Sequence, residues 1–466
     1  MKNYKGKNKK QWNNRKRRSS NKKKKVKVDC IAIDKQGKGV AKINEDNVSV
    51  PYLIEGEKAV VEVSKKRNYM TGKVKNIEKK SEDREVPKCP HYYQCGGCQL
   101  QHMKYEAQAK FKEKTVKGLL GKYGKINEVI TMDEPYDYRN KIHSTFSAGK
   151  KGKVISGIYE QYSHKVVPID RCIIQDPRAD NIIATVRKLM ESFKFKPFDE
   201  DSGRGFMRHI LIKTGNTSGE IMVVLVVASK MFPSRKNFIK ALLKKHPEIT
   251  TIVMNINNRR TSAVLGNNER VLYGKGYIED TLCGCVFQIS PKSFYQVNPI
   301  QTEKLYSKAI EMAKLDKRDI VLDAYCGIGT IALILSSNVK KVIGVELNND
   351  AVKDAIRNSK RNNIKNAHFY QGDAGDFMVQ MAERKEPVDT VFMDPPRSGS
   401  DEKFLSSIVK LSPKKVIYIS CNPVTQERDL KYLTKHGYNV KEIQPVDMFP
   451  HTYHVETVVS MVRKGK

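Results

Sequence analysis

The sequence lacks any long apolar run. Its longest, at residues 221–228, is far shorter than the roughly 20 residues that cross a bilayer. The basic N-terminus is followed by no apolar segment, so no secretory signal is predicted. We therefore expect a cytoplasmic protein with no membrane partner.

Acidic residues are also scarce. The 466-residue chain has 51 Asp and Glu against 86 Lys and Arg, a formal net charge of +35. Residues 1–25 contain no acid and are low in complexity, which predicts a basic disordered tail. Because the rest of the chain is strongly basic too, the charge favours a polyanionic partner, namely nucleic acid. A membrane surface is a poorer candidate, since no basic amphipathic helix is present.

The pattern of the chain divides it into three further regions. Residues 26–84 are short alternating runs separated by Gly and Asn turns, which predict a small β-barrel of a kind that commonly binds RNA. Residues 85–290 alternate strand-like runs with short helical patterns, which predict a mixed, sheet-rich central domain. Residues 291–466 have a βαβ rhythm, which predicts an α/β domain with a doubly wound parallel sheet.

A cofactor site is predicted in the last region. Residues 323–330 read DAYCGIGT between an apolar strand and a helix, so backbone amides can approach a ligand closely. Glu346 ends the next strand, where an acid can accept hydrogen bonds from ribose hydroxyls. A G-x-G motif alone is weak evidence for a nucleotide site, and this loop is not the complete G-x-G-x-x-G motif of a dinucleotide site. It looks instead like the first motif of a methyltransferase that uses S-adenosylmethionine.

Two later strand ends fit the same cofactor. Asp373 closes a third strand and is suited to a position near the adenine. Asp394 begins the motif DPPR after a fourth strand. Amino-group methyltransferases often carry Asn-Pro-Pro-aromatic there, so the acid and the Arg favour methylation of carbon.

Cys421 lies at the end of another predicted strand, in the stretch IYISCNP. Most free cysteines in an intracellular protein are small apolar core residues, and that interpretation applies here first. However, the carboxyl end of a strand in an open α/β sheet faces the ligand crevice. A thiol at that place is a candidate nucleophile.

Three other cysteines predict a metal site. Cys89, Cys95 and Cys98 form C-x5-C-G-G-C, and thiols in a reducing compartment are read as ligands rather than as disulfides. Spacing alone favours structural zinc, with His91 or His102 as a fourth ligand.

The motifs FYQVNPIQ, DAYCGIGT, DPPR, SCNP and HVETV occur in this order within residues 291–466. Together they resemble the RNA uracil-5-methyltransferases, and most closely the 23S ribosomal RNA branch. The resemblance implies a Rossmann-like S-adenosylmethionine methyltransferase domain, an N-terminal TRAM β-barrel over residues 26–84, and a mixed α+β central domain that carries an iron–sulfur cluster.

The resemblance also implies roles for individual residues. It assigns Cys421 as the nucleophile and Glu456 as the general base. It places S-adenosylmethionine against Gln296, Tyr325, Glu346, Asp373 and Asp394. It replaces zinc by a 4Fe-4S cluster on Cys89, Cys95, Cys98 and Cys172.

The predicted function is methyl transfer from S-adenosylmethionine to C5 of a uridine in 23S ribosomal RNA, through a covalent adduct between the cysteine and C6, by a monomeric enzyme. One alternative is the same chemistry on transfer RNA. Another is a non-catalytic RNA-binding protein with an inactive methyltransferase fold, against which the intact Cys421, Glu456 and Gln296 count.

Overall fold

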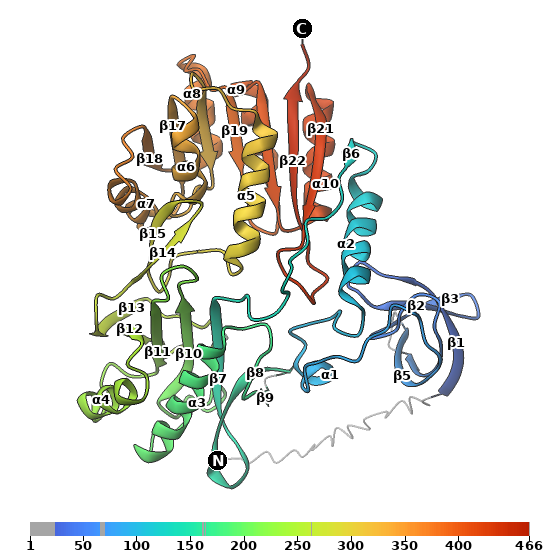
Figure 1. Ribbon diagram of the computed structural model, residues 1–466, viewed down its shortest axis with the longest axis vertical. Coiled ribbons are helices and arrows are strands. Elements are labelled where there is room, and N and C mark those ends of the chain that lie inside the picture. The colour runs from blue at the N-terminus through green and yellow to red at the C-terminus, as the bar shows by residue number, and fades with distance from the viewer. Residues whose placement is uncertain (1–23, 66–69, 161–162, 164, 262, 466) are drawn as a thin grey trace, which may run out of the picture. The chain divides into compact units, whose positions relative to one another are not determined.

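The computed structural model describes residues 24–65, 70–160, 163, 165–261 and 263–465 (Figure 1). Its contacts divide the chain into two compact units, one ending at Arg84 and the other spanning Glu85–Lys466. Most of the basic tail predicted for residues 1–25 lies outside the described residues. No described helix is both long and apolar enough to cross a membrane.

The first unit is a closed β-barrel, as its alternating sequence predicts. Alternate residues of its first strand point inwards, so Val28 and Cys30 are buried. Gly39 lies so close to this core that an added Cβ would be 2.8 Å from the Cys30 Sγ. The strands follow the order β1-β2-β3-β5-β4, with bounds β1 (Lys24–Ile33), β2 (Gly39–Ile43), β3 (Asp46–Val50), β4 (Lys58–Lys65) and β5 (Met70–Lys79).

A seven-stranded mixed sheet forms the middle of the chain. Its order is β13-β12-β11-β10-β7-β8-β9, with β7 (Lys141–Ala148), β8 (Val154–Tyr159), β9 (Val166–Pro168), β10 (Met207–Thr214), β11 (Ile221–Val227), β12 (Ile249–Ile256) and β13 (Asn268–Tyr273). The β11–β12 pair is parallel, and α4 (Arg235–Lys245) connects these two strands. A short 3-10 turn (Lys150–Gly152) lies between β7 and β8.

Strand β11 explains the longest apolar run of the sequence. Val223 and Leu225 lie in one core with α3 (Pro177–Ser192) and α4, whereas Val224 and Val226 lie in a second core shared with the C-terminal region. A strand buried on both faces has no polar side, which is why its sequence does not alternate.

The C-terminal region is an eight-stranded sheet in the order β18-β17-β16-β19-β20-β22-β21-β6. Its strands are β6 (Lys125–Ile126), β16 (Ile320–Ala324), β17 (Lys341–Glu346), β18 (Ala367–Gln371), β19 (Thr390–Met393), β20 (Lys415–Ser420), β21 (Tyr438–Val446) and β22 (Glu456–Arg463). Strands β18 to β20 are parallel, whereas β22 is antiparallel to both β20 and β21. The doubly wound sheet is therefore as predicted, with an antiparallel edge added.

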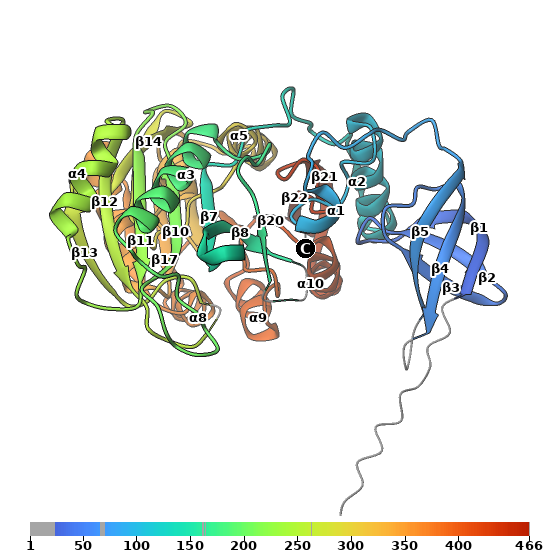
Figure 2. The same cartoon turned by 90° about the horizontal axis from the view of Figure 1, so that it is seen from below.

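Helices cover both faces of this sheet, and Figures 1 and 2 show α5 and α10 on opposite sides of it. The helices are α5 (Pro299–Ala313), α6 (Thr330–Leu335), the 3-10 turn η2 (Ser336–Asn338), α7 (Asn349–Arg361), α8 (Ala374–Glu383), α9 (Glu402–Leu411) and α10 (Pro423–Lys435). The chain reverses its winding at β16, which pairs with β17 on one side and β19 on the other. Ligands of open α/β sheets bind at the carboxyl ends of the strands at such a switch point.

Three smaller elements complete the second unit. The short helix α1 (Tyr92–Cys95) lies in the cysteine-rich segment, and α2 (Tyr105–Leu120) packs on the C-terminal sheet through Val116 and Leu120. The hairpin β14 (Ile278–Leu282) and β15 (Cys285–Ile289) precedes α5 and packs against α7.

Candidate active site

Cys421 and Glu456 lie together at the side of the sheet where its parallel strands end, which we call the ligand edge. Cys421 directly follows β20, and Glu456 is the first residue of β22. Ser420 pairs with Thr457 across the antiparallel ladder, so the next residues outwards, Cys421 and Glu456, lie opposite each other. Directly opposite residues have Cβ atoms about 4.5–5.5 Å apart. Asn422 caps α10 through a hydrogen bond from the Val424 N–H, which ends the strand and leaves Cys421 at its tip.

Burial raises the proton affinity of the acids at this edge. The Glu456 side chain is buried, and desolvation together with the charge of Asp394 raises its pKa to about 8. Desolvation also raises the pKa of the partly buried Asp394 to about 7. Both carboxyls therefore exchange protons near neutral pH, as a general base requires.

The Cys421 thiol is influenced by the same groups. Burial and the two neighbouring carboxylates raise its pKa to about 11, while the charge of Arg397 and a hydrogen bond from it act in the opposite direction. Arg397 follows Asp394 in the DPPR motif and is exposed. The cation is thus the group that stabilises the thiolate at this edge.

The glycine-rich loop after β16 lies at the neighbouring strand ends. Tyr325, Gly327 and Gly329 have φ angles of 66°, 55° and 82°, in the left-handed region. A Cβ at Gly329 would lie 2.9 Å from the Phe369 ring, so only glycine fits there. Glu346 accepts a hydrogen bond from the Gly327 N–H at 3.1 Å, which joins the loop to the end of β17.

Of the predicted cofactor residues, Tyr325 belongs to this loop and Asp373 follows β18. Tyr325 packs against Phe404, with ring centroids 4.9 Å apart. Asp373 is exposed at the end of the next strand, where it caps α8 through the Asp376 N–H. Lys403 lies 3.9 Å from the Asp373 carboxylate.

Gln296 reaches the same region from the segment before α5. It is buried and hydrogen bonds with Tyr306, a fully buried residue of α5 whose pKa is raised by burial and by Asp394. Tyr306 also hydrogen bonds with Thr330 at the start of α6. Five predicted cofactor residues and both predicted catalytic residues therefore lie along one edge of the sheet.

A comparison with known families identifies the family of this chain. Residues 104–464 match the family model described as tRNA (uracil-5-)-methyltransferase. The chain belongs to this family. It is an S-adenosylmethionine-dependent RNA methyltransferase.

Relatives cover nearly the whole chain. A protein of Clostridium tetani named as an uncharacterized RNA methyltransferase is 41% identical over 435 residues, which are 92% of this chain and 94% of that protein. A Clostridium acetobutylicum protein named in the same way is 42% identical over 438 residues, covering 92% of this chain and 95% of that protein.

A solved structure has the same fold. The Pyrococcus abyssi tRNA (uracil-54, C5)-methyltransferase in complex with S-adenosyl-L-homocysteine aligns with a TM-score of 0.76 and 27% identity, over 94% of this chain and 100% of that chain. The methyltransferase fold with an N-terminal barrel is therefore established for the present protein.

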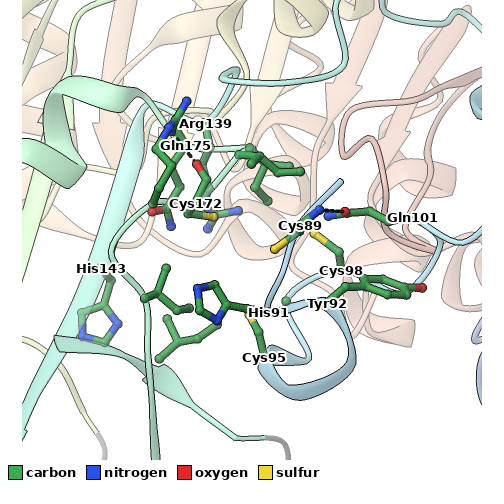
Figure 3. A pocket seen from close by; sticks show the side chains of 16 residues that line it. Cys89, His91, Tyr92, Cys95, Cys98, Gln101, Arg139, His143, Cys172 and Gln175 are labelled. Carbon is green, nitrogen blue, oxygen red and sulfur yellow. Dashed lines mark hydrogen bonds between the residues drawn. The ribbon is translucent and has the colours of Figure 1, made fainter. Parts of the chain in front are cut away.

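The four predicted cluster ligands of the methyltransferase, Cys89, Cys95, Cys98 and Cys172, line one cavity of about 300 Å³ (Figure 3). Cys172 lies on one side of the cavity and the other three lie opposite. Burial raises the pKa of Cys98 and of Cys172 to about 12. Among the described residues, no group of three or more His, Cys, Asp or Glu side chains is close enough to hold a metal ion. The thiols surround a space rather than meet at a point.

The two histidines considered as zinc ligands differ in position. His91 lines the cavity beside the cysteines. His102 is fully buried, and its Nδ1 lies 2.7 Å from the Tyr92 hydroxyl. It is not among the residues that line the cavity, whereas His91 is, so of the two suggested fourth ligands only His91 lies beside the cysteines.

Several groups near Cys421, Glu456 and the glycine-rich loop carry no sequence signal for a role there. Tyr306 stands in no recognised motif, and only its position within an apolar helix face distinguishes it. Asp323 is buried, accepts the Ala332 N–H at 2.9 Å, and has a pKa raised to about 8 by desolvation. Arg397 was visible as the last residue of DPPR, but its hydrogen bond with Cys421 was not predictable.

Replacing Arg397 with Met should slow alkylation of Cys421 at constant pH. The guanidinium opposes the rise of the Cys421 pKa to about 11, so its removal should raise that pKa further and reduce the thiolate several-fold. Mass spectrometry of the iodoacetamide-labelled Cys421 peptide over a pH series measures both the rate and the pKa.

Lys403→Met is the matched control, because Lys403 is an exposed cation of α9 that pairs with Asp376 at 2.7 Å rather than with Cys421. Its alkylation rate should equal that of the unmodified sequence. Equal rates for all three proteins would show that Arg397 does not act on the thiol.

Proposed function

We propose that the protein methylates C5 of a uridine in 23S ribosomal RNA, with Cys421 as nucleophile and Glu456 as base. The observation that carries this proposal is the pairing of Ser420 with Thr457, which sets a thiol opposite a buried carboxylate at the ligand edge of the sheet. Family membership supports uracil C5 as the target.

The chemistry requires both groups. Uracil C5 is a poor nucleophile, so the Cys421 thiolate first adds to C6 and the electrons move to C5. C5 then takes the methyl group of the sulfonium, and S-adenosylhomocysteine is released. Glu456 removes the remaining C5 proton, the C6–S bond breaks, and the double bond reforms with the Cys421 thiolate regenerated. The net products are 5-methyluridine, S-adenosylhomocysteine and a proton.

The two proposed groups differ in how far their proton affinities suit these steps, because burial and the neighbouring carboxylates raise the pKa of Cys421 to about 11 and disfavour the thiolate. With its pKa raised to about 8, Glu456 is a stronger base than an exposed carboxylate and acts through the fraction that is ionised near neutral pH. The Arg397 guanidinium stabilises the thiolate both before attack and after elimination.

S-adenosylmethionine is proposed to bind Gln296, Tyr325, Glu346, Asp373 and Asp394. Glu346 at the end of β17 is suited to the ribose hydroxyls, since its carboxylate is held at the loop by the Gly327 and Asn348 N–H groups. Gln296 and Asp394 both neighbour Tyr306, and Asp394 also neighbours the proposed nucleophile. They are therefore placed to orient the reacting groups.

The proposed RNA target is ribosomal. The four-cysteine segment and the barrel resemble the 23S ribosomal RNA branch, and the strong positive charge suits a large RNA. Transfer RNA is the second candidate, favoured by the likeness to the Pyrococcus abyssi enzyme.

A Glu456→Gln variant should accumulate a covalent protein–RNA adduct. The amide retains the shape of the side chain but cannot accept the C5 proton, so elimination fails after methyl transfer. With methyl-labelled S-adenosylmethionine, the label should migrate with a shifted band in denaturing electrophoresis.

The double variant Cys421→Ala with Glu456→Gln should give no band. Cys421→Ala alone should abolish methylation but change cofactor affinity by only a few-fold. Normal turnover by Glu456→Gln, or an adduct without methyl label, would exclude Glu456 as the base.

A strain that lacks the gene should lose a 5-methyluridine from 23S ribosomal RNA and retain those of transfer RNA. Mass spectrometry of RNase digests of the two purified RNA classes makes the comparison. Complementation with the intact gene should restore the nucleoside, and complementation with Cys421→Ala should not. Loss from transfer RNA alone would establish the second candidate.

A 4Fe-4S cluster is proposed on Cys89, Cys95, Cys98 and Cys172. All-thiolate ligation suits such a cluster, and the four cysteines line one cavity. Methyl transfer involves no electron transfer, so the cluster would supply structural support or help to position RNA.

Protein purified without oxygen should be brown and contain about four iron and four sulfide per chain. Cys172→Ser should lower both contents. Cys283→Ser, which changes a cysteine of the β14–β15 turn, is the matched control and should lower neither. One zinc per chain and no sulfide would overturn the assignment.

A further inference from the structure

The loop between β21 and β22, residues 447–455, has buried polar contacts that the proposed reaction does not use. It ends at Glu456, the proposed base. Asp447 forms an ion pair with Lys112 of α2, and neither side chain is exposed. Lys112 also donates its Nζ to the Phe449 carbonyl at 3.0 Å. The start of the loop is thus held by a buried lysine.

His451, in the middle of the loop, makes further contacts with α2. Its φ of 67° lies in the left-handed region, which a residue other than glycine keeps only when surrounding contacts enforce it. Gln108 of α2 accepts a hydrogen bond from the His451 N–H at 3.0 Å, and its Nε2 lies 3.3 Å from the His451 Nδ1. Burial lowers the pKa of His451 to about 4, so the ring is neutral.

The loop is also joined to the cysteine segment, which we define as residues 89–100. The His451 carbonyl accepts hydrogen bonds from the N–H groups of Gln99 and Leu100, each at 2.9 Å. These two residues directly follow Cys98 in the sequence. The cysteine segment and the loop that ends at the proposed base are therefore joined backbone to backbone.

Stability alone does not account for these contacts. The cost of desolvating a buried ion pair offsets much of its attraction, so apolar residues could fill the same space at little cost. Buried polar contacts do, however, penalise every arrangement that leaves a donor or acceptor unpaired. These contacts therefore favour one conformation of the loop that leads to Glu456.

We propose that Gln108, Lys112 and His451 are positioning residues that orient Glu456 for removal of the C5 proton. Through Gln99 and Leu100, the cysteine segment is part of the same support. This inference rests on the proposed function, in which Glu456 acts after methyl transfer. Loss of the support should therefore slow elimination more than attack or methyl transfer.

The decisive variant is Gln108→Leu, which keeps the approximate volume of the side chain and removes both contacts with His451. Its turnover should fall about tenfold to a hundredfold, as expected for a displaced catalytic group. The methyl-labelled protein–RNA adduct should meanwhile form a larger fraction of the enzyme at steady state. Affinity for S-adenosylmethionine should remain within about twofold of that of the unmodified sequence, because Gln108 is not among the residues proposed to bind the cofactor.

Gln444→Leu is the matched control. Gln444 is a buried glutamine of β21 whose Nε2 donates to the Glu128 carbonyl at 2.6 Å, outside the loop. Its replacement also removes a buried amide, but an amide that does not contact the loop. Gln444→Leu should therefore leave the adduct fraction unchanged. Gln108→Asn, which retains the amide but is one carbon shorter, should raise the adduct fraction to a smaller extent and serves if Gln108→Leu does not fold.

Hydrogen exchange provides a second measurement that needs no RNA. In Gln108→Leu, peptides containing residues 447–455 and residues 99–100 should lose protection together, because His451 links them. In Gln444→Leu neither peptide should change. Loss of protection in the loop alone would contradict the link to the cysteine segment.

The outcomes separate this inference from the proposed function. If Glu456→Gln traps the methylated adduct and the Gln108 variants match Gln444→Leu, the positioning role is wrong and the mechanism stands. If Glu456→Gln traps no adduct, the proposed mechanism fails and the inference fails with it.

Discussion

The antiparallel pairing of β22 with β20 is the constraint on which the candidate active site depends. Cys421 ends one strand and Glu456 begins the other, and they are opposite only in the observed register. Because side chains alternate between faces, a slip of one residue would move Glu456 to the other face of the sheet. The parallel strands bring the glycine-rich loop and Asp394 to the same end of the sheet, and the antiparallel pairing of β22 with β20 sets a carboxylate beside the thiol.

Burial at the ligand edge disfavours the charged forms of Asp394, Cys421 and Glu456. For the two carboxyls, this gives the higher proton affinity that the proposed mechanism uses. Desolvation raises the pKa of Asp394 and of Glu456 towards neutrality, whereas the exposed Arg397 supplies the opposing charge near Cys421. Burial therefore shifts the pKa values of these carboxyls towards physiological pH. The same burial disfavours the Cys421 thiolate, which the nearby Arg397 cation stabilises.

Elements distant in sequence complete this edge. Gln296 arrives from the segment before α5, held by Tyr306, and the 447–455 loop arrives from β21, held by α2. The cysteine segment reaches the same loop through the His451 carbonyl. The 447–455 loop and the cysteine segment are thus joined directly by backbone hydrogen bonds at His451.

The sequence by itself determined the doubly wound sheet, the barrel and the candidate residues at strand ends. Hydrophobic periodicity, glycine turns and short motifs such as DAYCGIGT and SCNP are local, so they can be recognised without coordinates. Only the tertiary structure identified Tyr306, Gln108 and the Lys112–Asp447 pair. These are polar residues in apolar surroundings whose partners lie far away in the chain, and the pairing of Lys112 with Asp447 spans 335 positions. A sequence pattern records the burial of a helix face, but not which distant group neutralises a charge within it.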